Sequence, residues 1–322
     1  MAIKTRFLIL SDTHGENIPN IQHIPADIAI HCGDLTDESK IEEFKTTIKL
    51  LKSIDAPLKL VIAGNHDFTL DVPLFKNKIA ENPDLQPEDV EKIYGGFGEI
   101  HQLFEDARSA GVVFLKEGIY HFELANGAKL KVYASPFTPS LSNWGFQYNP
   151  EEGHDFGIDK EIGVDIVVTH GPPHGIMDFT NSRQRVGCPQ LFGAIAQARP
   201  KFHCFGHNHE GWGAKLVTWR KEVSEVPSHF ADIDNEQSTV IQKLSNLSKS
   251  KFDTPETAEE KSKKRARLGR EGYIKTSHCT GDQNHLQAGS QTLFVNAAIE
   301  GVTEDYPMQL PWLVDLEMPE SF

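Results

Sequence analysis

The hydrophobic residues of this chain form short runs, and a cluster of polar residues follows each run at once. The clearest runs are residues 7–10, 28–30, 58–63, 166–168 and 202–205. Short runs rich in Ile and Val and bounded by Gly and Pro are typical of buried strands. The sequence therefore predicts a sheet structure whose strands end in polar loops.

A helix is predicted between the second and third runs. Apolar residues follow the helical period at Ile41, Phe44, Ile48 and Leu51. Ser39 and Glu42 have the spacing of a capping box, and residues 55–57 (Asp-Ala-Pro) end the helix. Strand, helix and strand in this order indicate a βαβ unit with parallel strands.

The remaining pattern predicts further elements of both kinds. We expect mostly helix over residues 68–111, strands over 112–115, 120–124 and 130–134, a helix over 191–198 and a strand over 292–297. Asn126-Gly127 indicates a hairpin. Residues 225–290 are rich in charged and hydroxyl side chains, so we expect a partly disordered insertion in one domain that spans residues 1–322.

The net negative charge of the chain argues against partners that are themselves polyanions. The chain has 322 residues and carries 32 Lys and Arg against 46 Asp and Glu, a formal net charge of −14. Such a chain repels phosphate backbones and anionic lipids, so we expect neither a duplex nucleic acid nor a membrane as partner.

Other features favour a cytoplasmic protein. The apolar run at residues 7–10 is too short for the core of a signal peptide, and the four cysteines form no CxxC pair. Residues 261–267 form a basic tract, which has the composition of a nuclear-localisation or anion-binding segment and also that of a solvated loop.

Metal-ligand residue types follow five of the predicted strands. Ligands gather beyond the carboxyl ends of strands in α/β sheets. These candidate ligands are Asp12, His14, Asp34, Asn65, His170, His207 and His209. All seven offer oxygen or nitrogen and none offers a thiolate, which suits a pair of divalent ions such as Mn, Fe or Zn.

These motifs resemble the signature of the calcineurin-like metallophosphoesterases. The resemblance rests on Asp12-x-His14, Gly33-Asp34, residues 64–67 (Gly-Asn-His-Asp), His170 and residues 206–209 (Gly-His-Asn-His). Residues 135–139, 171–173, 185–188 and 205–211 are similar to the class III-like branch, which includes the animal metallophosphoesterase-domain-containing proteins and their fungal relatives. The resemblance implies an α/β fold, a four-layer α/β/β/α sandwich with two mixed β-sheets flanked by helices.

The resemblance also implies a distribution of roles among the ligands. Asp12, His14, Asp34 and His209 would hold one ion, and Asp34, Asn65, His170 and His207 would hold the other, with Asp34 shared. A hydroxide between the ions would attack phosphorus in line. His66 would be the general acid, oriented by Asp67, unless it is a purely structural histidine.

Three further residues are candidates for substrate binding. His174 follows the predicted ligand His170 closely, and Arg183 and Arg185 could each bind a phosphate through the guanidinium fork. The alternative for the arginines is a solvated loop that pairs with Asp178 or with Glu residues.

The function that we expect is hydrolysis of small phosphodiesters or nucleotides, cyclic nucleotides among them, by a dimetal phosphoesterase. The alternatives are a phosphomonoesterase or protein phosphatase, a nuclease, which the acidic charge disfavours, and a non-catalytic metal-binding scaffold.

Overall fold

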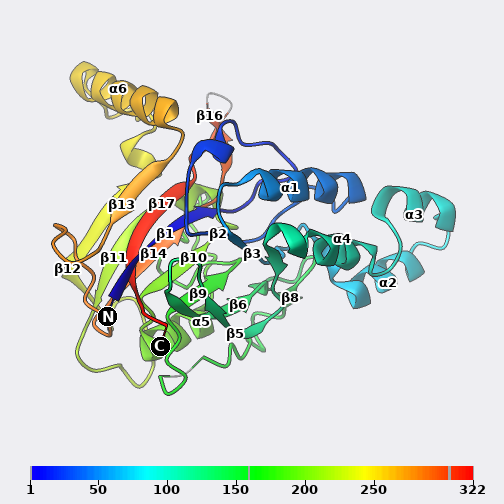
Figure 1. Ribbon diagram of the computed structural model, residues 1–322, viewed down its shortest axis with the longest axis horizontal. Helices are drawn as coiled ribbons and strands as arrows, with labels where there is room; N and C mark the ends of the chain where they lie inside the picture. The colour runs from blue at the N-terminus through cyan, green and yellow to red at the C-terminus, as the bar shows by residue number, and fades with distance from the viewer. Residues whose placement is uncertain (1, 159, 304–305, 322) are drawn as a thin grey trace.

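Two β-sheets face each other in the computed structural model, which describes residues 2–158, 160–303 and 306–321. In this part of the chain, the first sheet has six strands in the order β13-β17-β1-β2-β3-β4 and the second has seven in the order β12-β11-β14-β10-β9-β6-β5 (Figure 1). The first sheet consists of β1 (Ala2–Leu10), β2 (Ile28–His31), β3 (Leu58–Val61), β4 (Val112–Phe114), β13 (Ile274–Ser277) and β17 (Trp312–Pro319). The second consists of β5 (Gly118–Glu123), β6 (Lys129–Ser135), β9 (Ile166–Thr169), β10 (Phe202–Phe205), β11 (Gly213–Trp219), β12 (Ile233–Lys243) and β14 (Gln291–Asn296).

Both sheets are mixed. Strands β1, β2, β3 and β4 run parallel to one another, whereas β17 runs antiparallel to β1. In the second sheet β6, β9, β10 and β14 are parallel, and β5, β11 and β12 are joined antiparallel. The strands predicted from apolar runs are confirmed, and so is the βαβ unit of β2, α1 (Ile41–Ser53) and β3.

The strands are apolar on both faces because each sheet is covered on both sides. On β1, Phe7 and Ile9 belong to the core between the sheets, whereas Leu8 and Leu10 pack on the helix side. The other outer core joins the second sheet to α5 (Pro189–Ala198) through residues such as Phe192. This arrangement of helix, sheet, sheet and helix confirms the expected fold.

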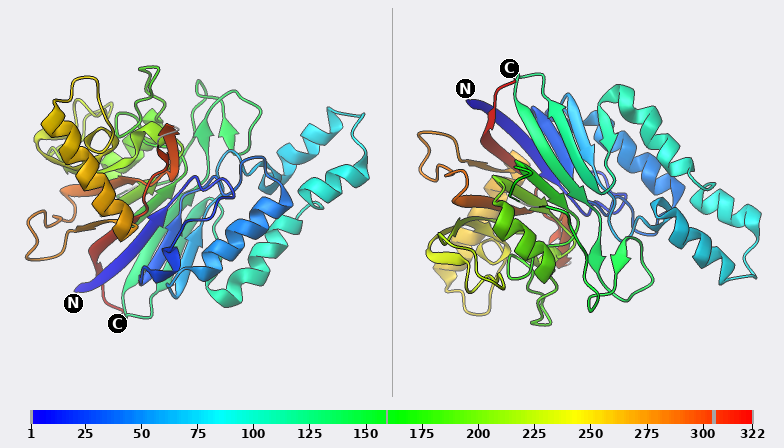
Figure 2. Two further views of the ribbon diagram at one scale, coloured as in Figure 1. Left: turned by 90° about the horizontal axis from the view of Figure 1, so that it is seen from above. Right: turned by 90° about the horizontal axis from the view of Figure 1, so that it is seen from below.

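Helices cover the outer face of the first sheet (Figure 2). They are α1 and α4 (Glu99–Ala107), which pack on it through residues such as Phe44 and Phe104. The helices α2 (Val72–Ala80) and α3 (Pro87–Tyr94) extend away from the sheet to one side (Figure 1). Residues 68–111 are mostly helical as expected. The cap of α1 differs from the prediction by one residue. The Glu43 carboxylate, not that of Glu42, accepts a hydrogen bond from the backbone N–H of Lys40, and the Ser39 hydroxyl contacts Thr69 instead.

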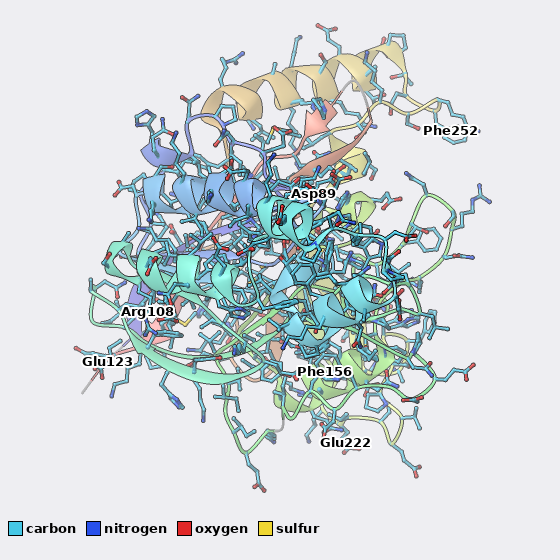
Figure 3. The ribbon with its side chains drawn as sticks, turned by 90° about the vertical axis from the view of Figure 1, so that its right-hand side faces the viewer. Asp89, Arg108, Glu123, Phe156, Glu222 and Phe252 are labelled. Atoms are coloured by element: carbon cyan, nitrogen blue, oxygen red, sulfur yellow. The ribbon has the colours of Figure 1, made fainter. Side chains whose placement is uncertain are left out.

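The segment 225–290, for which the sequence predicts partial disorder, includes regular elements. It contains β12, β13 and the helix α6 (Pro255–Glu271), and the two strands extend the two sheets (Figure 1). The basic tract 261–267 therefore lies on a helix and not in a loop. Leu268 is the buried residue of α6, and Phe252 before it is 83% exposed and projects from the body of the protein (Figure 3).

The strands β11 and β17 were not predicted from the sequence. Two short pairs, β7 (Thr138–Pro139) with β8 (Gln147–Tyr148) and β15 (Glu300–Thr303) with β16 (Tyr306–Met308), lie outside the two large sheets. Among the described helices, none combines the length and the apolar character that a membrane span requires.

Candidate metal centre

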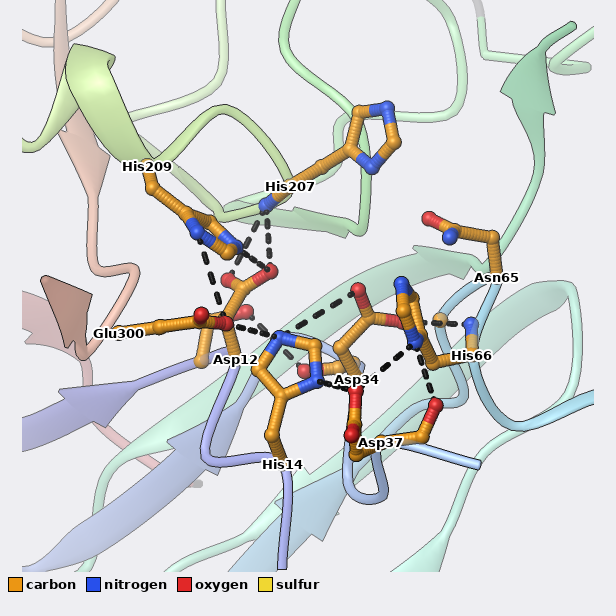
Figure 4. Close-up of polar contacts among 12 residues, drawn as sticks. Asp12, His14, Asp34, Asp37, Asn65, His66, His207, His209 and Glu300 are labelled. Carbon is orange, nitrogen blue, oxygen red and sulfur yellow. Dashed lines mark hydrogen bonds and ion pairs between the residues drawn. The ribbon is translucent and has the colours of Figure 1, made fainter. Parts of the chain in front are cut away.

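The carboxyl ends of five strands bring the predicted ligands together. Asp12 and His14 follow β1, Asp34 follows β2, Asn65 follows β3, His170 follows β9, and His207 and His209 follow β10. Figure 4 shows Asp12, His14, Asp34 and His209 converging from these loops. Both sheets contribute to one centre because the carboxyl ends of β1, β2 and β3 lie near those of β9 and β10.

One group of donors consists of Asp12, His14 and His209. Their ligand atoms lie within 4.8 Å of one another, and His209 Nε2 is 3.3 Å from Asp12 Oδ1. The other ring nitrogen of His14, Nδ1, is 3.1 Å from the carbonyl oxygen of Thr36, which fixes the orientation of the ring.

A second group consists of Asp34, His170 and His207, again with ligand atoms within 4.8 Å of one another. His170 Nε2 lies 3.3 Å from Asp34 Oδ2 and 2.9 Å from Asn65 Oδ1. Nδ1 of His170 is 2.9 Å from the carbonyl oxygen of Cys32, so it carries the proton and leaves Nε2 to bind an ion.

Asp34 lies between the two groups. Its Oδ2 atom faces His170 and is also 4.0 Å from His14 Nε2 in the first group. Its Oδ1 atom accepts a hydrogen bond of 2.8 Å from the backbone N–H of His66. This is the position that a ligand shared by two ions would need.

Four of the donors have a left-handed backbone. The φ angles are 53° for Asp12, 47° for His14, 52° for Asp34 and 64° for His207. L residues disfavour this region, and such residues cluster at functional sites.

Glycines allow the close approach between the loops. A Cβ atom at Gly206 would lie 2.0 Å from Asp12 Oδ2, and one at Gly64 would lie 2.3 Å from Asp34 Oδ1. Both glycines of the motifs are therefore required by packing against the donors.

The buried carboxylates stay ionised because histidines surround them. Burial opposes the charge of Asp12, but the facing His209 outweighs it and lowers the pKa of Asp12 to about 2. The pKa of Asp34 is also lowered, since the charge of His170 and its hydrogen bond outweigh burial.

The histidines respond in the opposite sense. Burial disfavours the cation of His170, yet the charge of Asp34 raises its pKa to about 9. Burial likewise opposes the cation of His14, but the contact with Glu300 and the charge of Asp34 raise its pKa to about 10. The protonated rings of His14 and His170 therefore balance the negative charge of the carboxylates. A divalent ion bound at the same place would displace these protons from the rings.

The donor set fits two divalent ions. Two buried carboxylates and four imidazole rings form two adjoining groups of three, and the Asn65 amide oxygen lies beside the second group. Asp34 of the second group also faces His14 of the first. Oxygen and nitrogen donors of this kind suit Mn, Fe and Zn alike.

His66 lies beside the first group. Its ring centroid is 4.8 Å from that of His14, and the ring stacks on Trp144 with centroids 4.2 Å apart. Nδ1 of His66 is 2.6 Å from the carbonyl oxygen of Asp37. The ring is therefore held from two sides, by an indole face and by a backbone acceptor.

Asp67 does not orient His66, which corrects the expected role. The wholly buried Asp67 carboxylate accepts hydrogen bonds of 3.0, 3.0 and 2.8 Å from the backbone N–H groups of Leu35, Thr36 and Gly64, and one of 2.7 Å from the Thr36 hydroxyl. Burial and the charge of Asp34 raise its pKa to about 6. Asp67 therefore ties together the two loops that carry Asp34 and Asn65.

The predicted substrate-binding residues His174, Arg183 and Arg185 lie between β9 and α5. Arg185 pairs with the buried Asp178 at 2.5 Å, and His174 Nδ1 lies 3.2 Å from the carbonyl oxygen of Gly187. Arg183 lies exposed in the same loop. The contacts described for these side chains do not reach a candidate metal ligand, so the pairing with Asp178 that we considered for the arginines holds for Arg185.

Three residues of the centre were missed from the sequence: Asp37, Trp144 and Glu300. Asp37 and Glu300 line a cavity of about 460 Å³ together with Asp12 and His14. Glu300 could have been found, because it follows the predicted strand at 292–297 as the other donors follow theirs. Trp144 belongs to a loop whose position nothing in the sequence pattern reveals.

Comparison with known proteins identifies the family. Residues 5–211 match the family described as calcineurin-like phosphoesterase. The chain is 32% identical over 229 residues to UPF0046 protein T07D4.2 of Caenorhabditis elegans, and this match covers 68% of the chain and 55% of that protein. It is 31% identical over 220 residues to human metallophosphoesterase domain-containing protein 1, and this match covers 65% of the chain and 62% of that protein.

The chain thus spans less than two thirds of the length of these relatives. Among solved structures, TT1561 of Thermus thermophilus is similar with a TM-score of 0.42 and 11% identity, over 66% of this chain and 84% of that one. The chain belongs to the calcineurin-like phosphoesterase family, in the branch of the metallophosphoesterase domain-containing proteins.

Proposed function

We propose that this protein is a dimetal phosphoesterase that hydrolyses small phosphodiesters, with cyclic nucleotides among its substrates. The observation that carries the proposal is the meeting of two donor groups, Asp12/His14/His209 and Asp34/His170/His207, with His66 beside them. Membership of the family supports metal-dependent phosphoester hydrolysis, and the preference for diesters is our own inference.

The candidate ligands divide the work of holding the ions. Asp12, His14 and His209 would hold one ion, His170, His207 and Asn65 the other, and Asp34 both. Bound divalent ions would supply Lewis-acid stabilisation of the phosphoryl oxygens and a water of lowered pKa as the nucleophile.

His66 is the proposed general acid. Its Nδ1–H donates to the carbonyl oxygen of Asp37, so Nε2 is the atom that can give a proton to the departing alkoxide. The stack on Trp144 limits rotation of the ring and keeps Nε2 in one direction.

The charge of the adjoining cavity favours a diester. Its lining includes the carboxylates of Glu16, Asp37 and Glu300, and among the described residues that line it there is neither Lys nor Arg. A phosphomonoester is a dianion near neutral pH, whereas a diester carries one negative charge. The acidic lining therefore repels a monoester more strongly than a diester.

The test compares substrates that differ in their leaving groups. Protein loaded with Mn²⁺ is assayed on 2′,3′- and 3′,5′-cyclic AMP, whose alkoxides need a proton to depart, and on bis-p-nitrophenyl phosphate, whose leaving group does not. We expect His66→Ala to lose about 10²–10⁴-fold in kcat on the cyclic nucleotides and much less on the nitrophenyl diester. His121→Ala, a change at an exposed histidine on β5, is the matched control and keeps the rate.

Two results would refute the proposal. One is that the Mn²⁺-loaded protein turns over neither diester faster than the His66→Ala variant does. The other is a higher kcat/KM for p-nitrophenyl phosphate than for bis-p-nitrophenyl phosphate, which would favour a phosphomonoesterase instead.

A further inference from the structure

Glu300 reaches the first donor group from a different part of the chain. It is the first residue of β15, and its Oε2 atom lies 2.9 Å from His14 Nε2 and 3.6 Å from His209 Nδ1 (Figure 4). It therefore contacts two of the three donors that would hold the first ion.

The backbone of Glu300 is fixed to the loop of the ligands. Its own N–H donates to the carbonyl oxygen of Asp12 at 3.2 Å, and the N–H of Ile299 donates to that of Ser11 at 2.8 Å. Gln309, directly after β16, secures the preceding residue, because its N–H donates to the carbonyl oxygen of Ile299 at 2.6 Å. The side chain starts from a position set by the residue that is itself a candidate ligand.

The first group has room for another donor. Asp12, His14, His209 and the shared Asp34 provide four donors, whereas Mn²⁺ and Mg²⁺ prefer about six, mostly oxygens. One further protein donor would therefore still leave a position for the nucleophilic water. The Glu300 carboxylate is half exposed toward the cavity and half covered by the histidines. The carboxylate is 2.9 Å from His14 Nε2, the ring nitrogen left free to bind an ion, so an ion bound there would lie within its reach. It contacts His209 through Nδ1, whereas Nε2 of that ring faces Asp12.

We propose that Glu300 is an additional carboxylate ligand of the ion held by Asp12, His14 and His209, an inference that rests on the proposed dimetal centre. The competing explanation is a salt bridge that exists only while His14 is protonated and that the incoming ion breaks. The two explanations predict opposite effects of removing the Glu300 charge on metal affinity.

The test measures metal binding directly. Metal-free protein is titrated with Mn²⁺ by isothermal calorimetry in the wild type, in Glu300→Gln and in Glu16→Gln. Glu16 lines the same cavity but has no described contact with a candidate ligand, so its variant is the matched control. We expect Glu300→Gln to weaken one of the two binding events by at least about tenfold, and Glu16→Gln to leave both within twofold.

A second measurement reads the coordination itself. Co²⁺ in tetrahedral sites absorbs visible light more strongly than Co²⁺ with more ligands, so loss of a ligand raises the absorbance of the Co²⁺-loaded protein. We expect this rise in Glu300→Gln and not in Glu16→Gln. Circular dichroism of the metal-free variants checks that both are folded.

The outcomes separate this inference from the proposed function. If wild type binds two ions and Glu300→Gln binds both with unchanged or higher affinity, Glu300 is not a ligand, while the dimetal centre stands. If wild type itself binds no ion, both the inference and the proposed function fall.

Discussion

The imidazole of His66 lies flat against the indole of Trp144, with ring centroids 4.2 Å apart and planes inclined by 26°. An aromatic stack of this kind contributes about 0.5–1.5 kcal/mol. The general acid that we propose is thus positioned by a residue of the loop between β7 and β8, far from it in the sequence.

Replacing this indole tests the positioning. We expect Trp144→Ala to lower kcat on cyclic nucleotides by about two- to tenfold, because the unsupported His66 ring spends less time aimed at the leaving group. Trp144→Phe retains a stacking face and most of the rate. An equal loss on bis-p-nitrophenyl phosphate, whose leaving group needs no proton, would contradict a role through His66.

Asp67 stabilises the loops beneath the centre. We expect Asp67→Asn to lower the free energy of unfolding by about 1.5–3 kcal/mol, since an amide cannot accept the bonds from Leu35, Thr36 and Gly64 as a carboxylate does. Urea denaturation of the metal-free protein measures the change. Asp84→Asn, at an exposed position, is the control and stays within about 0.5 kcal/mol of wild type. A change in Asp67→Asn as small as that of the control would be evidence against this role.

The glycine beside Asp12 leaves no room for a side chain. We expect Gly206→Ala to lower the free energy of unfolding by about 1–3 kcal/mol and to weaken binding of the first ion, because its methyl group displaces the Asp12 carboxylate. Gly269→Ala is the opposite case, since it meets no atom within 4 Å on α6 and raises helix stability by about 0.5–1 kcal/mol. Thermal unfolding and Mn²⁺ titration of the two variants provide the comparison. Unimpaired Mn²⁺ binding by Gly206→Ala would show that the loop adapts.

Asp315 on β17 links stability to pH away from the metal centre. Its buried carboxylate lies 2.8 Å from Arg6 Nε and 3.1 Å from Lys4 Nζ, and these contacts outweigh burial and lower its pKa. A carboxyl whose pKa is lower in the folded state stabilises the fold above its unfolded pKa of about 3.9. This stabilisation is lost as the pH falls through the folded value.

We therefore expect Asp315→Asn to be less stable than wild type by about 1.5–3 kcal/mol at pH 7, and the difference to shrink as the pH falls below about 4. Urea denaturation in the presence of EDTA across this range measures it, since the carboxylates of the centre then affect both proteins alike. A difference that is constant down to the lowest pH would contradict the linkage.

The sequence predicted the part of the fold in which local pattern and burial agree. Strands such as β2 and β9 are continuous apolar runs because both of their faces are covered, and their polar tips follow from chain order alone. Strand β12 lies at the edge of its sheet and alternates little, so its polar sequence resembled a disordered segment. Helix α6 buries only Leu268, so it lacks the apolar stripe by which the other helices are recognised. Its local signals, Thr254 and Pro255 at the start and Gly272 at the end, were overlooked.

Some residues of the site could be predicted from the sequence and others could not. The candidate ligands could be picked out from the sequence because each follows a strand within a few residues. Trp144 and Asp37 act through their positions in space, which the packing of loops determines and the residue pattern does not express. Asp67 shows the reverse error, since its neighbour in the sequence, His66, is not its partner in the structure.

Four candidate ligands have a left-handed backbone: Asp12, His14, Asp34 and His207. This conformation places donors for an ion but lowers the stability of the fold. Each such residue costs on the order of 1 kcal/mol, a noticeable share of the roughly 5–15 kcal/mol by which a typical protein is stable. Glycine at any of the four would relax the chain and remove a donor at the same moment. Selection of this protein for heat resistance alone would therefore favour variants that are more stable and have lost metal donors.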